Sequence, residues 1–166
     1  MYIFVTTLLL LIILLLQTTI FATVNIGGII PNLIIILISS IGFSRGRKMG
    51  LIFGFLAGLI LDIFYGPLIG LYAIAFMYIG FLNGYVKRVL FTGDFALPIG
   101  IILLSDFVYC NFIYVCLYLL QGDFNYLFYF THKIIPELIS TGIAAILLYP
   151  MFNLIFTKLE KVYADE

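Results

Sequence analysis

Three acidic residues are the first candidates for chemistry, because Asp62, Asp106 and Glu137 each lie within a long apolar segment. An ionised carboxylate at the middle of a bilayer costs at least a few kcal/mol, so such residues usually face a bundle interior, pair with another group or mark a site. We expect Asp62, at the end of the third segment, and Glu137, at the start of the sixth, to lie in the outer half of the membrane. Asp106 is expected to lie deeper, in the middle of the fifth segment.

A stripe of small residues leads to Asp62. Gly50, Gly54, Gly58 and Asp62 recur every four residues, which places them on one face of a helix. Small residues let a second backbone approach closely, so we assign the three glycines to helix packing. Two interpretations of Asp62 stay open, which are a binding role and a hydrogen-bonded structural cap.

The sixth apolar segment carries one narrow polar and small face, formed by Glu137, Ser140, Thr141, Ala144 and Ala145. Their spacing of three and four residues is that of one helix face. This face indicates a candidate polar recess or partner-binding surface. A purely structural alternative for Glu137 is that the helix dipole favours a carboxylate at the N-terminal end of a helix.

Two prolines bracket this face. Pro136 can open the helix without penalty, whereas Pro150 should kink it near its cytoplasmic end. We therefore expect both prolines to shape the sixth helix.

Asp106 has Tyr109 and Cys110 on its own helix face and Asn111 nearby. A hydrogen-bonded Asp packed against a neighbouring helix would need no function. A proton or cation pathway would need a second acidic residue at similar depth, and the sequence alone points to none.

Catalysis finds little support in the sequence. The single histidine, His132, falls in a predicted outer connection, and Cys110 and Cys116 are expected to be packed free thiols. No Ser lies in a nucleophile elbow, no His/Cys cluster has metal-ligand spacing, and no phosphate-binding glycine motif is present. We predict no enzyme, no catalytic residue, no cofactor and no metal.

Composition defines the class of protein. Of the 166 residues, 64% are apolar and 10% are charged, and the formal net charge is zero. Soluble domains carry about 25% charged residues, and nucleic-acid proteins show a basic footprint. The sequence therefore predicts an all-α integral membrane protein with a single domain over residues 1–166 and no nucleic-acid partner.

Six apolar segments predict six membrane helices in one bundle. They run over about 2–22, 28–43, 50–64, 67–86, 96–120 and 134–157. The first lacks the basic start and cleavage site of a signal peptide, so we expect it to stay in the chain as a membrane helix. A re-entrant segment near Gly66 and Pro67 is the main alternative to six crossings.

Basic residues predict the orientation. If both termini are cytoplasmic, seven of the eight Lys and Arg residues fall on the cytoplasmic side and only Lys133 lies outside, as the positive-inside rule expects. The outer connection from Gln121 to Lys133 is rich in aromatic side chains. We expect it to lie along the outer membrane surface, with a docking patch for an external partner as the alternative.

Residues 54–76, GFLAGLILDIFYGPLIGLYAIAF, resemble the signature of the MreD family of rod shape-determining membrane proteins. In that family a glycine-rich helix leads to an Asp and then to a glycine-containing turn. The resemblance adds Gly66 and Gly70 to the packing glycines. The segment PELISTGIAAILLYPMFNLI also resembles the last helix of the family, with Pro136, Thr141 and Pro150 in matching places.

The resemblance implies a non-enzymatic role in the complex that elongates rod-shaped bacterial cells. The implied partner is a single-pass MreC-like protein in the cell membrane, with MreB filaments and peptidoglycan synthases as indirect partners and membrane lipid around the bundle. The family fold is thought to be similar to substrate-binding subunits of energy-coupling-factor transporters.

Such a vitamin or metal transporter subunit is the runner-up function. Those subunits typically dock through an Ala-x-x-x-Ala stripe on the first helix, and they often line an external pocket with Trp. Residues 2–21 contain no Ala and the chain contains no Trp, which favours the shape-determining role. A proton-coupled or ion-conducting protein, resting on Asp62, Asp106 and Glu137, is a third class.

These observations give one hypothesis for the site, in which Asp62 and Glu137 line a single outward-opening polar recess. Asp106, Ser140 and Thr141 are further candidates for this recess or for partner binding. Asp62→Asn or Glu137→Gln should then weaken partner retention and leave membrane insertion intact.

Overall fold

The computed structural model describes residues 2–20, 30–66, 68–86, 96–119, 122 and 124–164, and all of its regular elements are helices. Seven of these elements are α-helical and two are π-helical turns. Their bounds are α1 Tyr2–Leu15, η1 Leu16–Ile20, α3 Leu33–Arg45, α4 Arg47–Tyr65, α5 Leu71–Val86, α6 Ala96–Leu117, α7 Tyr126–Tyr129, η3 Phe130–Ile134 and α8 Ile135–Ala164.

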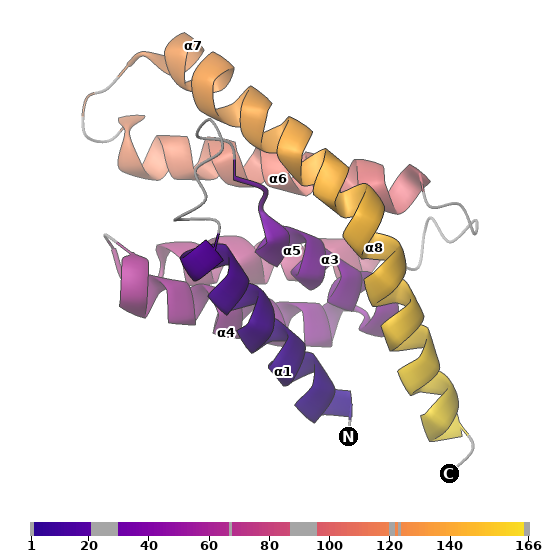
Figure 1. The fold of residues 1–166 in the computed structure, drawn as a ribbon. Coiled ribbons are helices and arrows are strands. Elements are labelled where there is room, and N and C mark those ends of the chain that lie inside the picture. The colour runs from indigo at the N-terminus through magenta and orange to yellow at the C-terminus, as the bar shows by residue number, and fades with distance from the viewer. Residues whose placement is uncertain are drawn as a thin grey trace.

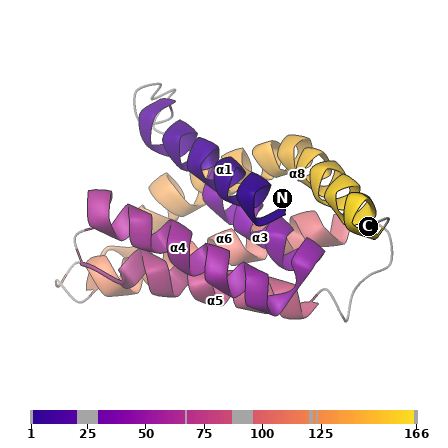
Figure 2. The ribbon, with the colours of Figure 1, turned by 90° about the horizontal axis from the view of Figure 1, so that it is seen from below.

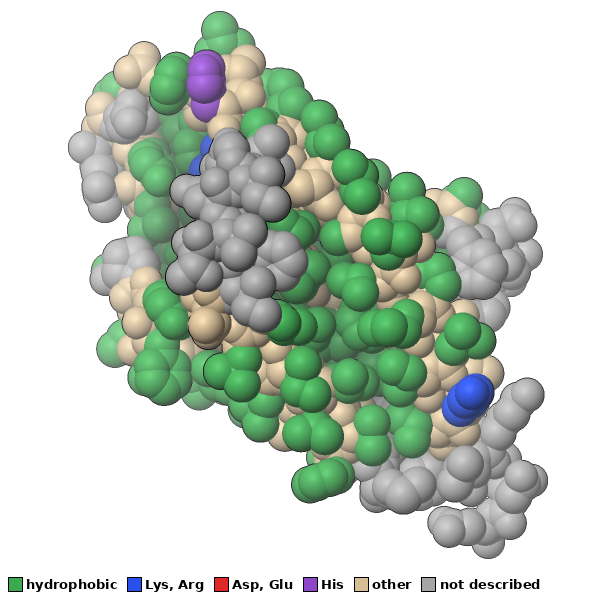
Figure 3. Space-filling model, viewed as in Figure 1, with side chains coloured by type: hydrophobic (Ala, Val, Ile, Leu, Met, Phe, Trp, Pro, Cys, Tyr) green, Lys and Arg blue, Asp and Glu red, His purple; other side chains and the backbone are tan. Residues whose placement is uncertain are grey.

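Three described helices are long and apolar enough to cross a membrane, namely Arg47–Tyr65, Ala96–Leu117 and Tyr126–Leu159. Three shorter apolar helices accompany them, namely Ile3–Thr19, Leu33–Arg45 and Leu71–Val86. Hydrophobic side chains cover most of the face seen in Figure 3. The described part of the chain is thus an all-helical, strongly apolar bundle.

Helix α3 forms the centre of the bundle. Its residues from Leu33 to Phe43 are all buried, and it contacts α1, α4, α5, α6 and α8. Figures 1 and 2 show α3 enclosed by the other helices. Asn32 begins the helix, because its side-chain oxygen accepts a hydrogen bond from the Ile35 N–H at 3.4 Å, the usual N-cap arrangement.

Helices α4 and α5 form the closest pair. A Cβ atom added to Gly50, Gly54 or Gly58 would lie 2.2–2.3 Å from a backbone oxygen of Gly80, Phe76 or Tyr72 respectively. The residue numbers of the α5 partners decrease as those of the α4 glycines increase, so the two helices are antiparallel. Pro67 lies outside the described residues, and the flanking segments form two regular helices packed side by side.

The connection predicted between the second and third helices is shorter than expected. Only Gly46 separates α3 from α4, and its φ of 84° lies in the left-handed region that favours glycine. Arg47 and Lys48 therefore belong to the first turn of α4. The helix therefore begins three residues before the apolar segment predicted over about 50–64.

The predicted outer connection is also wrong in part. Residues from Tyr126 onwards are helical and continue without a break through α7 and η3 into α8. No Gly or Pro interrupts residues 126–135, and the rings of Tyr126 and Tyr129 pack on Tyr114 of α6. Tyr129 is 8% exposed, and its ring centroid lies 4.9 Å from that of Tyr114.

Helix α8 changes direction along its length (Figure 1), and Pro150 lies inside it. A proline within a helix removes a backbone hydrogen bond and is a common cause of a bend. The start of α1 and the end of α8 lie at the same end of the molecule in both ribbon views (Figures 1 and 2).

Candidate functional site

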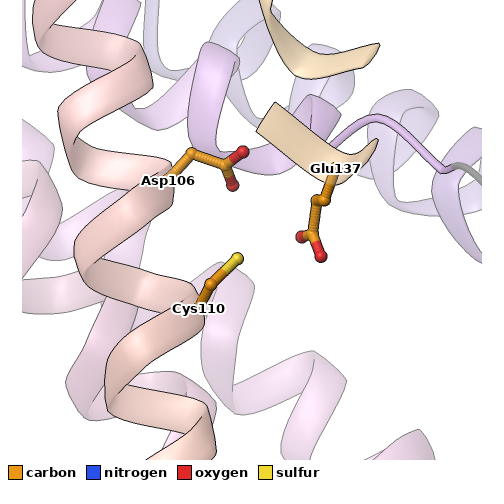
Figure 4. A group of neighbouring side chains, drawn as sticks. All are labelled: Asp106, Cys110 and Glu137. Atoms are coloured by element: carbon orange, nitrogen blue, oxygen red, sulfur yellow. The ribbon is translucent and has the colours of Figure 1, made fainter. Parts of the chain in front are cut away.

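Two helices bring three metal-ligating side chains together. Asp106 and Cys110 come from α6 and Glu137 comes from α8, and one carboxylate oxygen or sulfur atom of each lies within 4.8 Å of the others. Figure 4 shows the three side chains directed toward the same space between the helices. We call this group the Asp106–Cys110–Glu137 cluster.

Local helix geometry explains the placement of the cluster. Asp106 and Cys110 are four residues apart on a regular helix, so they share one face. Glu137 lies in the first turn of α8, directly after the π-helical turn η3. In that turn the Ile135 N–H donates to the Phe130 carbonyl five residues earlier. This wider turn ends just before Pro136.

Asp106 is the most enclosed member of the cluster. Its side chain is 0% exposed, and neither carboxylate oxygen has a hydrogen-bond partner among the described residues. Asn32 and Thr141 are its polar neighbours, but their geometry falls short of a hydrogen bond. A buried carboxylate without a partner is costly, so this group needs an explanation.

A cavity of about 490 Å³ adjoins the cluster. Glu137 lines it together with Asn32 and Tyr109, and η3 contributes His132 and Lys133. The ammonium group of Lys133 also lies 5.5 Å from the centre of the Tyr129 ring. The cavity is therefore lined by an acid, a base and an amide, and its size suits a small polar occupant.

Thr141 and Ser140 lie on α8 beside Glu137 and play different parts. Thr141 is fully buried, and its Oγ1 accepts a hydrogen bond from the Asn32 N–H at 3.0 Å, which joins α8 to the start of α3. The Ser140 hydroxyl donates to the Glu137 carbonyl of its own helix at 3.0 Å. Only Thr141 thus links two helices here.

Asp62 lies elsewhere and has hydrogen-bond partners. Its two carboxylate oxygens accept hydrogen bonds from the Tyr72 and Ala73 N–H groups at 2.9 and 2.8 Å. The first N–H groups of a helix have no acceptor within the helix itself, so Asp62, near the end of α4, caps the N-terminus of α5. Asp62 does not line the cavity that Glu137 lines. The geometry corresponds to the structural interpretation of Asp62.

The glycines predicted for packing divide into two groups. Gly50, Gly54 and Gly58 lie against the α5 backbone, and a Cβ on Gly66 would come 2.8 Å from the Asp62 backbone. Gly70 differs, because a Cβ there would meet nothing within 4 Å and its φ is 103°. Gly70 serves the turn before α5 by its left-handed conformation, not by a packing contact.

Sequence reasoning missed a second buried polar group. The Asn83 amide donates to the hydroxyl groups of Ser39 at 2.7 Å and Ser105 at 3.0 Å, so it joins α3, α5 and α6. The sequence offered a signal in Asn83, a polar residue inside an apolar segment, but it did not identify the two partners.

The cluster was missed for a similar reason. Asp106 and Cys110 are four residues apart in the sequence, but a search for His and Cys ligand spacings does not detect a pair formed by an Asp and a Cys. Nothing in the sequence showed that α6 packs against α8, so the close approach of Glu137 to Asp106 and Cys110 could not be predicted. The structure supplies the second acidic residue that appeared to be missing.

Comparison with known proteins identifies a family. The family described as rod shape-determining protein MreD matches residues 1–159. No curated protein and no solved structure gives a significant match.

Proposed function

The chain belongs to the MreD family of rod shape-determining proteins, and from this premise we propose that it is a membrane scaffold of the cell-elongation complex. The match over residues 1–159 is the observation that carries the proposal, because it covers every membrane-helix candidate. A shape-determining family is not a known enzyme family, which agrees with a non-enzymatic role.

The scaffold would bind an MreC-like single-pass protein and help to position peptidoglycan synthesis. A rigid bundle suits such a task. Its α4–α5 pair is in backbone contact, and buried polar hydrogen bonds join α3 to α5 and α8. MreB filaments and the synthases would be indirect partners on the two sides of the membrane.

We further propose six crossings of the bacterial cytoplasmic membrane, with both termini in the cytoplasm. The start of α1 and the end of α8 share one end of the molecule, as an even number of crossings requires. Arg47 lies over the Tyr85 ring at 5.6 Å, so the start of α4 meets the end of α5. This contact places Arg47 and Lys48 at the end of the bundle where α5 ends at Val86.

A second candidate function rests on the cavity of about 490 Å³ beside Glu137. A cavity of this size, lined by both polar and apolar residues, would suit substrate capture by a subunit similar to those of energy-coupling-factor transporters. The scaffold is the proposal favoured by the family match.

The test is a pull-down of the tagged full chain from its native membrane in mild detergent, with mass spectrometry of the chains that co-purify. We expect a single-pass protein with a large extracytoplasmic part, together with cell-wall synthases. Untagged membranes and an unrelated tagged membrane protein are the controls. Recovery of two ATPase subunits with a second transmembrane subunit would replace the scaffold by the transporter function.

A further inference from the structure

We propose that Asp106, Cys110 and Glu137 form a binding site for a divalent transition-metal ion of the zinc class. This inference is independent of the scaffold role, because it rests only on the contents of the space between α6 and α8. Its three donors are two carboxylates and one thiol, whose ligating atoms already lie within 4.8 Å of one another.

The donor set suits such an ion. Zinc binds Cys sulfur at about 2.3 Å and carboxylate oxygen at about 2.0–2.2 Å in tetrahedral geometry, which places ligand atoms roughly 3.3–3.8 Å apart. The flexible Glu137 side chain needs to move by roughly 1 Å to reach this spacing. Hard ions such as Mg²⁺ and Ca²⁺ prefer oxygen donors alone, so the thiol favours a transition metal.

The backbone places the ligands as known metal sites do. Asp106 and Cys110 lie at positions i and i+4 of one helix, the spacing at which two ligands of a helical zinc motif face the same ion. Glu137 approaches from the facing helix (Figure 4). Three protein ligands leave the fourth position of a tetrahedral ion for water or another group.

The unpartnered carboxylate of Asp106 points independently to a ligand. Both of its oxygens are buried without a hydrogen-bond partner among the described residues, and they face Cys110 and Glu137 (Figure 4). Two neighbouring carboxylates repel each other unless a positive charge compensates them. A dication between them supplies that charge and a direct ligand bond.

The cavity beside Glu137 offers a route for the ion. Its lining includes Lys133 and His132 from η3 and Asn32 from the start of α3. Metal binding would deprotonate the Cys110 thiol, because the thiolate is the ligand, and would release that proton to the solvent. The fully occupied site would then combine a dication with three negative ligands, with the Lys133 ammonium nearby.

The test uses Co²⁺ as a spectroscopic substitute for Zn²⁺ on the full chain, purified in detergent and freed of metal by a chelator. A cobalt–thiolate bond gives a charge-transfer band in the near ultraviolet. We expect this band to saturate at one Co²⁺ per chain and to disappear when Zn²⁺ is added.

Cys110→Ser should abolish the band, whereas Cys116→Ser should retain it. Cys116 is a matched control because it is the other free cysteine and lies on the same helix. Asp106→Asn and Glu137→Gln should each weaken Co²⁺ binding at least about tenfold, since even changes to groups behind metal ligands cost about 10–100-fold.

Size-exclusion profiles will show whether each variant remains folded, and calorimetric titration with Zn²⁺ gives a second reading that needs no thiolate band. No saturable binding by the folded wild-type chain would overturn the proposal. A band that persists in Cys110→Ser, or that disappears in Cys116→Ser, would also overturn it.

Discussion

At the scale of single residues, Asp62 and Glu137 differ in their surroundings, although both carboxylates lie near the end of an apolar segment. Asp62 is 2% exposed and satisfies two backbone N–H groups of α5. Glu137 is half-buried and faces a cavity and two other potential ligands. The first carboxylate is therefore needed by the fold, whereas the second is available for binding.

Asp62→Asn should destabilise the protein. The amide has one acceptor oxygen, and its NH₂ group would face a backbone N–H, so at least one charge-assisted hydrogen bond is lost. Such bonds contribute about 1.5–3 kcal/mol each, and the midpoint of thermal unfolding in detergent should fall accordingly. Glu137→Gln is the matched carboxylate-to-amide control and should leave the midpoint nearly unchanged. Equal midpoints for the two variants would argue against the capping role.

At the scale of helices, the α4–α5 pair depends on the absence of side chains. Gly54→Ala would place a methyl group 2.3 Å from the Phe76 carbonyl oxygen, which forces the two backbones apart. Overpacking of this kind costs about 1–3 kcal/mol. The expected result is a lower unfolding midpoint in detergent.

Gly100→Ala is the control for that substitution. Gly100 also lies inside a helix, α6, but a Cβ there would meet nothing within 4 Å. Alanine is the better helix former by about 1 kcal/mol, so this variant should be as stable as the wild type or more so. A comparable loss in both variants would argue against the close approach of α4 and α5 as the cause.

Helices with a strong local pattern could be predicted from the sequence, whereas the segment around Tyr126 could not. The four-residue repeat of Gly50, Gly54 and Gly58 is a local signal, and it indicated a close contact without naming α5. The segment after Gln121 mixes aromatic and polar residues, which is also typical of a surface loop. Its helix is stabilised by contacts with α6, such as that of Tyr126 with Asn111, and sequence alone does not reveal contacts between segments.

At the scale of the whole molecule, a buried α3 organises the bundle. Its composition could be predicted as apolar, but its central place could not, because a helix that is hydrophobic all round gives no direction to its neighbours. The Asp106–Cys110–Glu137 cluster could not be predicted either, because it also depends on contacts between helices. It exists only because α6 and α8 pack together.

The proposed topology can be measured on the whole chain. A fluorescent protein that folds only in the cytoplasm should be fluorescent when fused to either end, whereas alkaline phosphatase at the same places should be inactive. The physical reason is the cytoplasmic retention of basic connections. Insertion of the same reporters near Gly122, between α6 and α7, should give the opposite pattern. Alkaline phosphatase activity at only one terminus would mean an odd number of crossings.

The π-helical turn at Phe130–Ile134 determines which faces of α7 and α8 point toward α6. An α-helix turns about 100° per residue, so the extra residue in this turn changes the direction in which the later side chains point around the helix axis, relative to the earlier ones. Before this turn, Tyr129 contacts Tyr114 of α6 and Tyr118 just after its end. After the turn, Glu137 lies close to Asp106 and Cys110 of α6. A regular α-helix over the same eight steps from Tyr129 to Glu137 would set the two side chains about 80° apart, so without the wider turn the helix could face α6 through its aromatic side chain or through its carboxylate, but not through both.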